Sequence, residues 1–79
     1  MKHIEYLPKP VWDEIEKRLE SYKDLPFNSR NRRMIEHMCE QVLSDYCTNN
    51  DFNNEGIFFE TYETGPDTFK TIPFRENMQ

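Results

Sequence analysis

The sequence has very little glycine or cysteine, no long apolar run and no alanine at all. Its two glycines, Gly56 and Gly65, cannot build the glycine-rich loop that holds a phosphate, which excludes the common nucleotide-binding motifs. No segment approaches the roughly 20 consecutive apolar residues of a transmembrane helix, and residues 1 to 10 lack the apolar run of a signal peptide. We therefore expect a cytoplasmic protein without membrane contact.

The missing alanine is accompanied by seven asparagines. This bias is typical of AT-rich genomes such as those of many phages, and it carries no chemistry. If the source is viral, the expected location is the host cytoplasm.

The two cysteines, Cys39 and Cys47, are eight residues apart in a segment with the pattern of one helix. A helix separates such positions by about 12 Å, whereas a disulfide needs Cα atoms within about 7 Å. The spacing predicts two reduced thiols that serve as small core residues.

The residue types needed for catalysis or metal binding do not occur in suitable arrangements. A nucleophile must lie beside a base, and Cys39 and His37, two apart on a helix, point in different directions. His3, His37, Cys39 and Cys47 lack the CxxC or HxxxH spacing of a zinc site. We predict a protein that is not an enzyme and that has no catalytic residues, no metal and no cofactor.

Charge is distributed unevenly along the chain. Residues 1 to 33 contain eight Lys and Arg and six Asp and Glu, whereas residues 34 to 79 contain two and nine, so the halves carry net charges of +2 and −7. Such an acidic second half favours a partner with a basic surface.

The apolar pattern predicts two helices. From Pro10, which suits a first helical turn, apolar residues recur at helical spacing for about 15 residues, supported by the pairs Asp13 with Lys17 and Glu14 with Arg18. Asn28 or Ser29 can cap a second helix that ends near Thr48. Its apolar face is formed by Met34, Ile35, Met38, Cys39, Val42, Leu43 and Tyr46.

Strands are predicted at both ends of the chain. Residues 2 to 7 alternate polar and apolar side chains, and residues 56 to 63 and 68 to 74 flank the turn signal of residues 64 to 67, as in a β-hairpin. A register with Ile57 opposite Phe74 places Ile57, Phe59, Ile72 and Phe74 on one face, and Phe58, Tyr62 and Phe69 with Glu60 and Thr71 on the other.

We therefore predict one small α+β domain over residues 1–75, followed by a frayed tail at 76–79. Its order is β-α-α-β-β. Two antiparallel helices pack on the C-terminal hairpin, and the N-terminal strand is a possible third member of the sheet.

Two groups of residues are candidate binding sites. The first is an acidic surface with aromatic anchors, which predicts docking on a basic protein surface. It comprises Glu36, Glu40, Phe58, Glu60, Tyr62, Glu63 and Phe69. The second is an anion site formed by Arg30, Arg32 and Arg33 in the first turn of the second helix. The alternative to an anion site is that these arginines form ion pairs with glutamates of the same molecule.

The leading hypothesis is a non-enzymatic interaction protein, a phage-type or accessory modulator or inhibitor that binds a basic surface of a nucleic-acid-associated protein. The first alternative is a small regulator that binds nucleic acid through Arg30, Arg32 and Arg33; it ranks below a protein partner because the net charge of −5 repels nucleic acid. The second alternative is a structural homo-oligomer, such as a homodimer, that buries Phe58, Tyr62 and Phe69 against its own copy.

Overall fold

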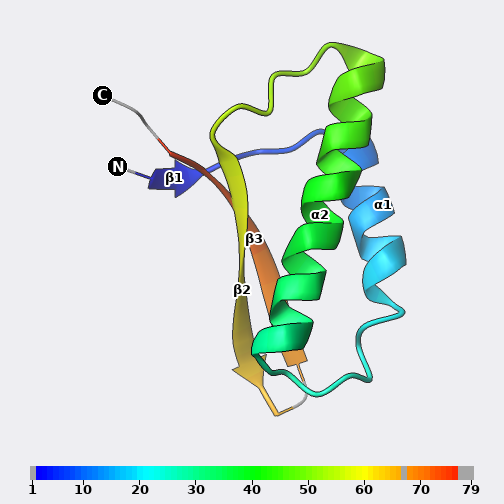
Figure 1. Ribbon diagram of the computed structural model, residues 1–79, viewed down its shortest axis with the longest axis vertical. Helices are drawn as coiled ribbons and strands as arrows, with labels where there is room; N and C mark the ends of the chain where they lie inside the picture. The colour runs from blue at the N-terminus through cyan, green and yellow to red at the C-terminus, as the bar shows by residue number, and fades with distance from the viewer. Residues whose placement is uncertain (1, 67, 77–79) are drawn as a thin grey trace.

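A computed structural model describes residues 2–66 and 68–76 of the chain and shows five elements (Figure 1). The strands form one antiparallel sheet in the order β1-β3-β2, so the N-terminal strand is its third member. The predicted α+β class and β-α-α-β-β order are confirmed. The elements are β1 (Lys2–Ile4), α1 (Lys9–Leu19), α2 (Ser29–Asn50), β2 (Ile57–Gly65) and β3 (Thr68–Glu76).

Helix α1 is shorter than the predicted 15 residues, with 11. Its surface ion pairs differ in part from the sequence prediction. Lys9 Nζ lies 3.0 Å from Asp13 Oδ2, so Asp13 pairs with the preceding turn and not with Lys17. Arg18 Nε and Glu14 Oε2 are 2.8 Å apart, as the spacing predicts.

Helix α2 begins and ends with polar residues that satisfy its backbone. The Asn28 side chain accepts a hydrogen bond of 2.9 Å from the Asn31 N–H, which is the predicted N-cap. The helix continues two residues past the predicted end at Thr48, and Asp51 follows in the left-handed conformation with φ of 54°.

The hairpin register differs by one residue from the predicted one. Ile57 lies opposite Arg75 rather than Phe74, because an irregularity between Glu63 and Gly65 adds a residue to β2 at the turn. Side chains alternate along a strand, so this shift exchanges the two faces of β3. Phe69 and Thr71 therefore face the helices, and Ile72 and Phe74 lie on the opposite face, the reverse of the prediction.

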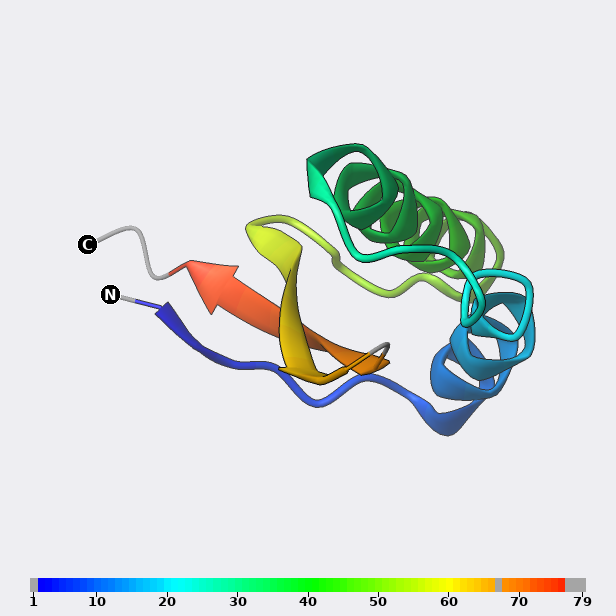
Figure 2. The same ribbon diagram turned by 90° about the horizontal axis from the view of Figure 1, so that it is seen from below.

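The helices lie on one side of the sheet, and the core fills the space between the two layers (Figure 2). On the sheet side, Thr61 Oγ1 and Thr71 Oγ1 form a buried hydrogen bond of 3.2 Å, so both hydroxyls are satisfied. The buried apolar residues are Leu7, Val11, Ile15, Ile35, Met38, Cys39, Val42, Leu43 and Phe59.

Strand β1 is short for a reason that lies in β3. The Glu5 N–H donates to the Pro73 carbonyl oxygen at 3.0 Å, but proline has no N–H to return the second bond of the pair. Regular pairing therefore stops at Ile4, and the described residues of β1 that pair with β3 are Lys2, His3 and Ile4.

Strand β3 continues two residues past its predicted end at Phe74, and its last residue, Glu76, pairs with Lys2. The remainder of the predicted tail, residues 77 to 79, and the turn residue Asp67 lie outside the described residues. Among the helices of the described chain, neither is long and apolar enough to cross a membrane.

Candidate functional site

The face of the sheet turned away from the helices, here called the outer face, carries a row of large apolar side chains. Ile4, Phe74 and Phe58 come from β1, β3 and β2 and lie directly opposite one another. The rings of Phe58 and Phe74 stack with centroids 5.8 Å apart, and Ile4 is 55% exposed. Three strands thus contribute to one apolar surface.

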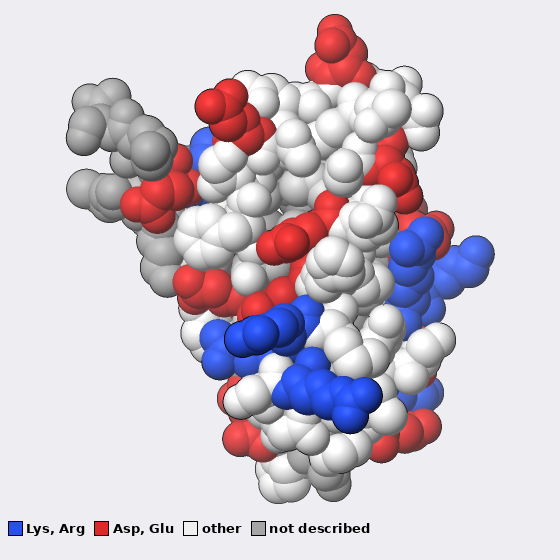
Figure 3. All heavy atoms as spheres, in the orientation of Figure 1, with Lys and Arg blue, Asp and Glu red and all other residues white. Residues whose placement is uncertain are grey.

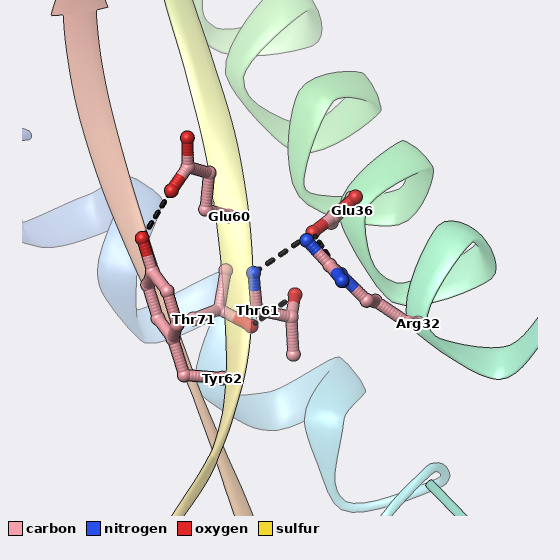
Figure 4. Close-up of polar contacts among 6 residues, drawn as sticks. All are labelled: Arg32, Glu36, Glu60, Thr61, Tyr62 and Thr71. Atoms are coloured by element: carbon pink, nitrogen blue, oxygen red, sulfur yellow. Dashed lines mark hydrogen bonds and ion pairs between the residues drawn. The ribbon is translucent and has the colours of Figure 1, made fainter. Parts of the chain in front are cut away.

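Tyr62 and Glu60 extend this surface along β2. Both point away from α2 in Figure 4, and the Tyr62 hydroxyl donates a hydrogen bond to Glu60 Oε1. Tyr62 is 40% exposed. The outer face therefore combines aromatic rings with a carboxylate, as the sequence predicts for Phe58, Glu60 and Tyr62.

Phe69 does not belong to this surface. It faces the helices, packs against the core and stacks on Phe27 with ring centroids 6.3 Å apart. The sequence prediction placed it beside Phe58 and Tyr62, and the register shift of β3 is the reason for the error.

Glu36 connects α2 to β2, the edge strand of the sheet. Its Oε2 accepts a hydrogen bond of 2.8 Å from the Thr61 N–H, which points away from β3, and lies 3.3 Å from Arg32 Nε (Figure 4). This carboxylate satisfies an edge donor that is partly buried, so Glu36 has a structural function.

Replacing Glu36 by alanine is expected to lower the free energy of unfolding by about 1–3 kcal/mol, because the Thr61 N–H loses its acceptor. Glu36→Gln, which keeps an acceptor oxygen, should recover most of that loss. Urea denaturation followed by circular dichroism measures both. Glu40→Ala, one turn further along α2 and exposed, is the matched control and should change stability by less than about 0.5 kcal/mol. Equal losses in E36A and E40A would show that the contact to Thr61 contributes nothing.

The other acidic candidates surround this contact. Glu40 is exposed one turn after Glu36, and Glu63 is exposed two residues after Thr61 on the same face of β2. Figure 3 shows acidic side chains over β2 and over the seam between β2 and α2. We call Glu36, Glu40, Glu60 and Glu63 the acidic edge. Glu60 is the member of this group whose side chain lies on the outer face.

The three arginines are not equivalent. Arg32 pairs with Glu36, as expected if these arginines pair with glutamates of the same molecule. Within residues 2–66 and 68–76, no acidic side chain forms an ion pair with Arg30 or Arg33. Both line a groove beside α1, while Arg32 lies on the sheet side of α2.

Cys39 and His37, the two residues considered for catalysis, differ in solvent exposure. Cys39 is fully buried, and burial, with the nearby carboxylates of Glu36 and Glu40, raises the pKa of its thiol to about 12. His37 is exposed on α2. Among the residues that the structure describes, no three His, Cys, Asp or Glu side chains lie close enough to hold a metal ion.

Sequence reasoning missed three residues of the outer face: Ile4, Ile72 and Phe74. The alternation of Ile4 and Tyr6 with polar residues gave a signal for the first of them, since it marks one apolar face of a strand. Ile72 and Phe74 depend on the irregularity at Glu63 and Gly65, which has no clear sequence signature.

No protein-family model matches this chain, and no similarity was found to a curated protein or to a solved structure.

Proposed function

We propose that this chain is a non-catalytic interaction protein, a modulator or inhibitor, that binds a basic surface of a larger, nucleic-acid-associated protein. The observation that carries the proposal is the apolar outer face with the acidic edge beside it. Aromatic side chains supply the desolvated anchors of such an interface, and surrounding carboxylates supply its orientation and its selectivity for a basic partner.

The charge around this surface supports a basic partner. Of the two basic residues in the second half of the chain, Arg75 is engaged inside the molecule: it pairs with Glu5 and donates to the carbonyl oxygens of Glu55 and Asn53 at 2.8 and 3.2 Å. Lys70, opposite Tyr62, is the other. Arg32, which pairs with Glu36, and Arg33, which lines a hollow with Glu36, also lie nearby, so the four glutamates of the acidic edge exceed these three cations by one.

The outer face alone is too small for a standard protein interface, so the acidic edge is needed as well. Strand β2 has nine residues, so the sheet is about 30 Å long, and its three strands span about 10 Å. This gives an outer face of about 300 Å², whereas each partner of a standard interface contributes roughly 800 Å². A stable complex on the outer face would have to extend onto the acidic edge or past β1.

A hollow beside β1 offers a place for a partner side chain. It has a volume of about 410 Å³, and its lining includes Ile4, Tyr6, Trp12, Lys70 and Ile72. Pockets of this kind hold the central anchors of interfaces.

The test is affinity capture from lysate of the native or host cell, at low salt and at about 0.5 M salt, with and without nuclease. We expect a stoichiometric protein that resists nuclease and is released by salt. With that partner purified, the double variant Glu40→Lys/Glu63→Lys and the variant Tyr62→Ala should each weaken binding at least about tenfold, measured by calorimetry.

Glu16→Lys, an exposed position on α1, is the control for charge reversal and should bind like the wild type. Glu36 is unsuitable for this purpose because of its bond to Thr61. If the partner binds E40K/E63K and Y62A with unchanged affinity, docking through this surface is wrong.

The absence of an ion pair to Arg30 and Arg33 within the described chain supports the alternative of a nucleic-acid-binding regulator. The same capture experiment separates the two proposals. Recovery of DNA or RNA that is lost in the triple variant Arg30→Ala/Arg32→Ala/Arg33→Ala would favour the alternative. A homo-oligomer through Phe58 and Tyr62 predicts self-association in sedimentation equilibrium that Y62A abolishes.

A further inference from the structure

A groove lies between the end of α1 and the N-terminal half of α2, away from the sheet. Its volume is about 750 Å³, and its lining includes Tyr22, Arg30, Arg33, Met34, His37 and Met38. Figure 3 shows basic side chains gathered over this half of α2. We call the groove lined by these residues the methionine groove.

The groove combines an apolar floor with a cationic rim. Met34 and Met38 are one turn apart on α2, and Met34 is 42% exposed, although its helical position predicts a core residue. Arg30, Arg33 and His37 follow the same side of α2 at spacings of three and four residues. Methionine side chains adapt to irregular apolar surfaces and are common in grooves that accept helices.

The cationic rim contains two arginines that have no ion-pair partner among residues 2–66 and 68–76. These are Arg30 and Arg33, while the neighbouring Arg32 is held by Glu36. The N-terminus of α2 adds the partial positive charge of its helix dipole. A ligand for this groove should therefore carry negative charge beside an apolar stripe.

We propose that the methionine groove binds an acidic amphipathic helix of a partner protein. Such a helix would place its apolar residues on the exposed Met34 and the partly exposed Tyr22, beside the buried Met38, and its carboxylates near Arg30 and Arg33. A small anionic ligand fits less well, because such ligands are mostly enclosed by their pockets, and the exposed Met34 shows that this groove is open. A nucleic acid backbone would use the arginines but has no side chain for the methionine floor.

This inference does not depend on the proposed function. The methionine groove faces away from the sheet and has a cationic rim, whereas the outer face lies on the sheet and is bordered by the acidic edge, so the two sites would take different partners although Glu36 and Glu40 share α2 with the groove. Variants of one site should leave the other unchanged, and failure of one proposal is therefore distinguishable from failure of the other.

The test uses a fluorescent synthetic peptide with leucines at positions i, i+3, i+4 and i+7 and glutamates on both flanks, titrated against the full chain by fluorescence anisotropy. We expect saturable binding and an increase in peptide helicity. Met34→Glu and the double variant Arg30→Glu/Arg33→Glu should each weaken binding at least about tenfold. Lys9→Glu/Lys70→Glu has the same charge change at sites away from the groove, and its affinity should stay within about twofold of the wild type.

A version of the peptide with lysine in place of glutamate should not bind, and circular dichroism should show that all variants are folded. The proposal is overturned if the acidic peptide does not bind the wild type or binds R30E/R33E equally well. It is also overturned if a single-stranded oligonucleotide binds in a manner sensitive to R30E/R33E but not to M34E. Self-association that M34E abolishes would show instead that the groove is an interface between copies of this chain.

Discussion

Replacing Ile35 by alanine is expected to remove most of the stability of this fold. Ile35 is 1% exposed and lies in the core between α2, α1 and the sheet. Truncation of a buried isoleucine costs about 2–5 kcal/mol through lost burial and the cavity that remains. A single core of this size provides only roughly 3–5 kcal/mol in total. Urea denaturation should therefore show an I35A variant that is substantially unfolded without denaturant.

The matched control is Met34→Ala, the preceding residue on the same helix. Because Met34 is 42% exposed whereas Ile35 is 1% exposed, its truncation should lower the free energy of unfolding by less than about 1 kcal/mol. If I35A unfolds at nearly the same urea concentration as M34A, the packing of α2 against the sheet does not carry the stability described here.

The second large effect concerns the reactivity of Cys39. Thiolates are the reactive form of cysteine, and burial raises the pKa of the Cys39 thiol from 9.0 to about 12. At pH 8 the thiolate population of Cys39 is therefore about a thousandfold lower in the folded protein than at its ordinary pKa. We expect iodoacetamide to modify Cys47 well before Cys39, as measured by mass spectrometry, and to modify both in urea.

Burial also raises the pKa of Cys47, which is only partly covered, so its protection should be weaker. In a Cys47→Ser variant the remaining thiol should react at a rate that follows unfolding. Equal rates for the two cysteines in the folded wild type would contradict the burial of Cys39. The raised pKa also means that this thiol stabilises the fold below about pH 9, and that its contribution is lost as the pH rises toward 12.

The helices and the hairpin could be predicted from the sequence because their signals are local. Asn28 marks the start of α2, and the apolar spacing from Ile35 to Leu43 marks its buried face. The N-terminal strand was found by alternation alone. Its position beside β3 could not be deduced, because its pairing partner lies at the other end of the chain.

The faces of the sheet were predicted only in part. Ile57 and Phe59 face the helices as expected, and Phe58, Glu60 and Tyr62 lie on the outer face. A single additional residue between Glu63 and Gly65 exchanges the two faces of β3 relative to the prediction, while the strand direction is as predicted. Turn composition does not determine such an irregularity, so Phe69 was assigned to the wrong face.

The candidate sites depend on tertiary packing to different degrees. The acidic edge follows from residue type, but the structural function of Glu36 depends on the approach of α2 to Thr61. Helical periodicity assigns Met34 to the core, whereas the path of α1 leaves it exposed in the methionine groove. Periodicity shows which side of a helix is apolar and does not show how much of that side its neighbours cover.

The pairing of β1 with β3 determines when the sheet can be completed. Lys2 pairs with Glu76, so β1 cannot complete its pairing until β3 has been synthesised, after the other described elements. Before then the helix pair can collapse on contacts close in sequence, and β2 can pair with β3 once both strands have left the ribosome. Closing the long loop between β1 and β3 carries the largest entropic cost of any contact in the fold and yields few hydrogen bonds. We therefore expect docking of β1 to be the last step of folding, the step that completes the outer face.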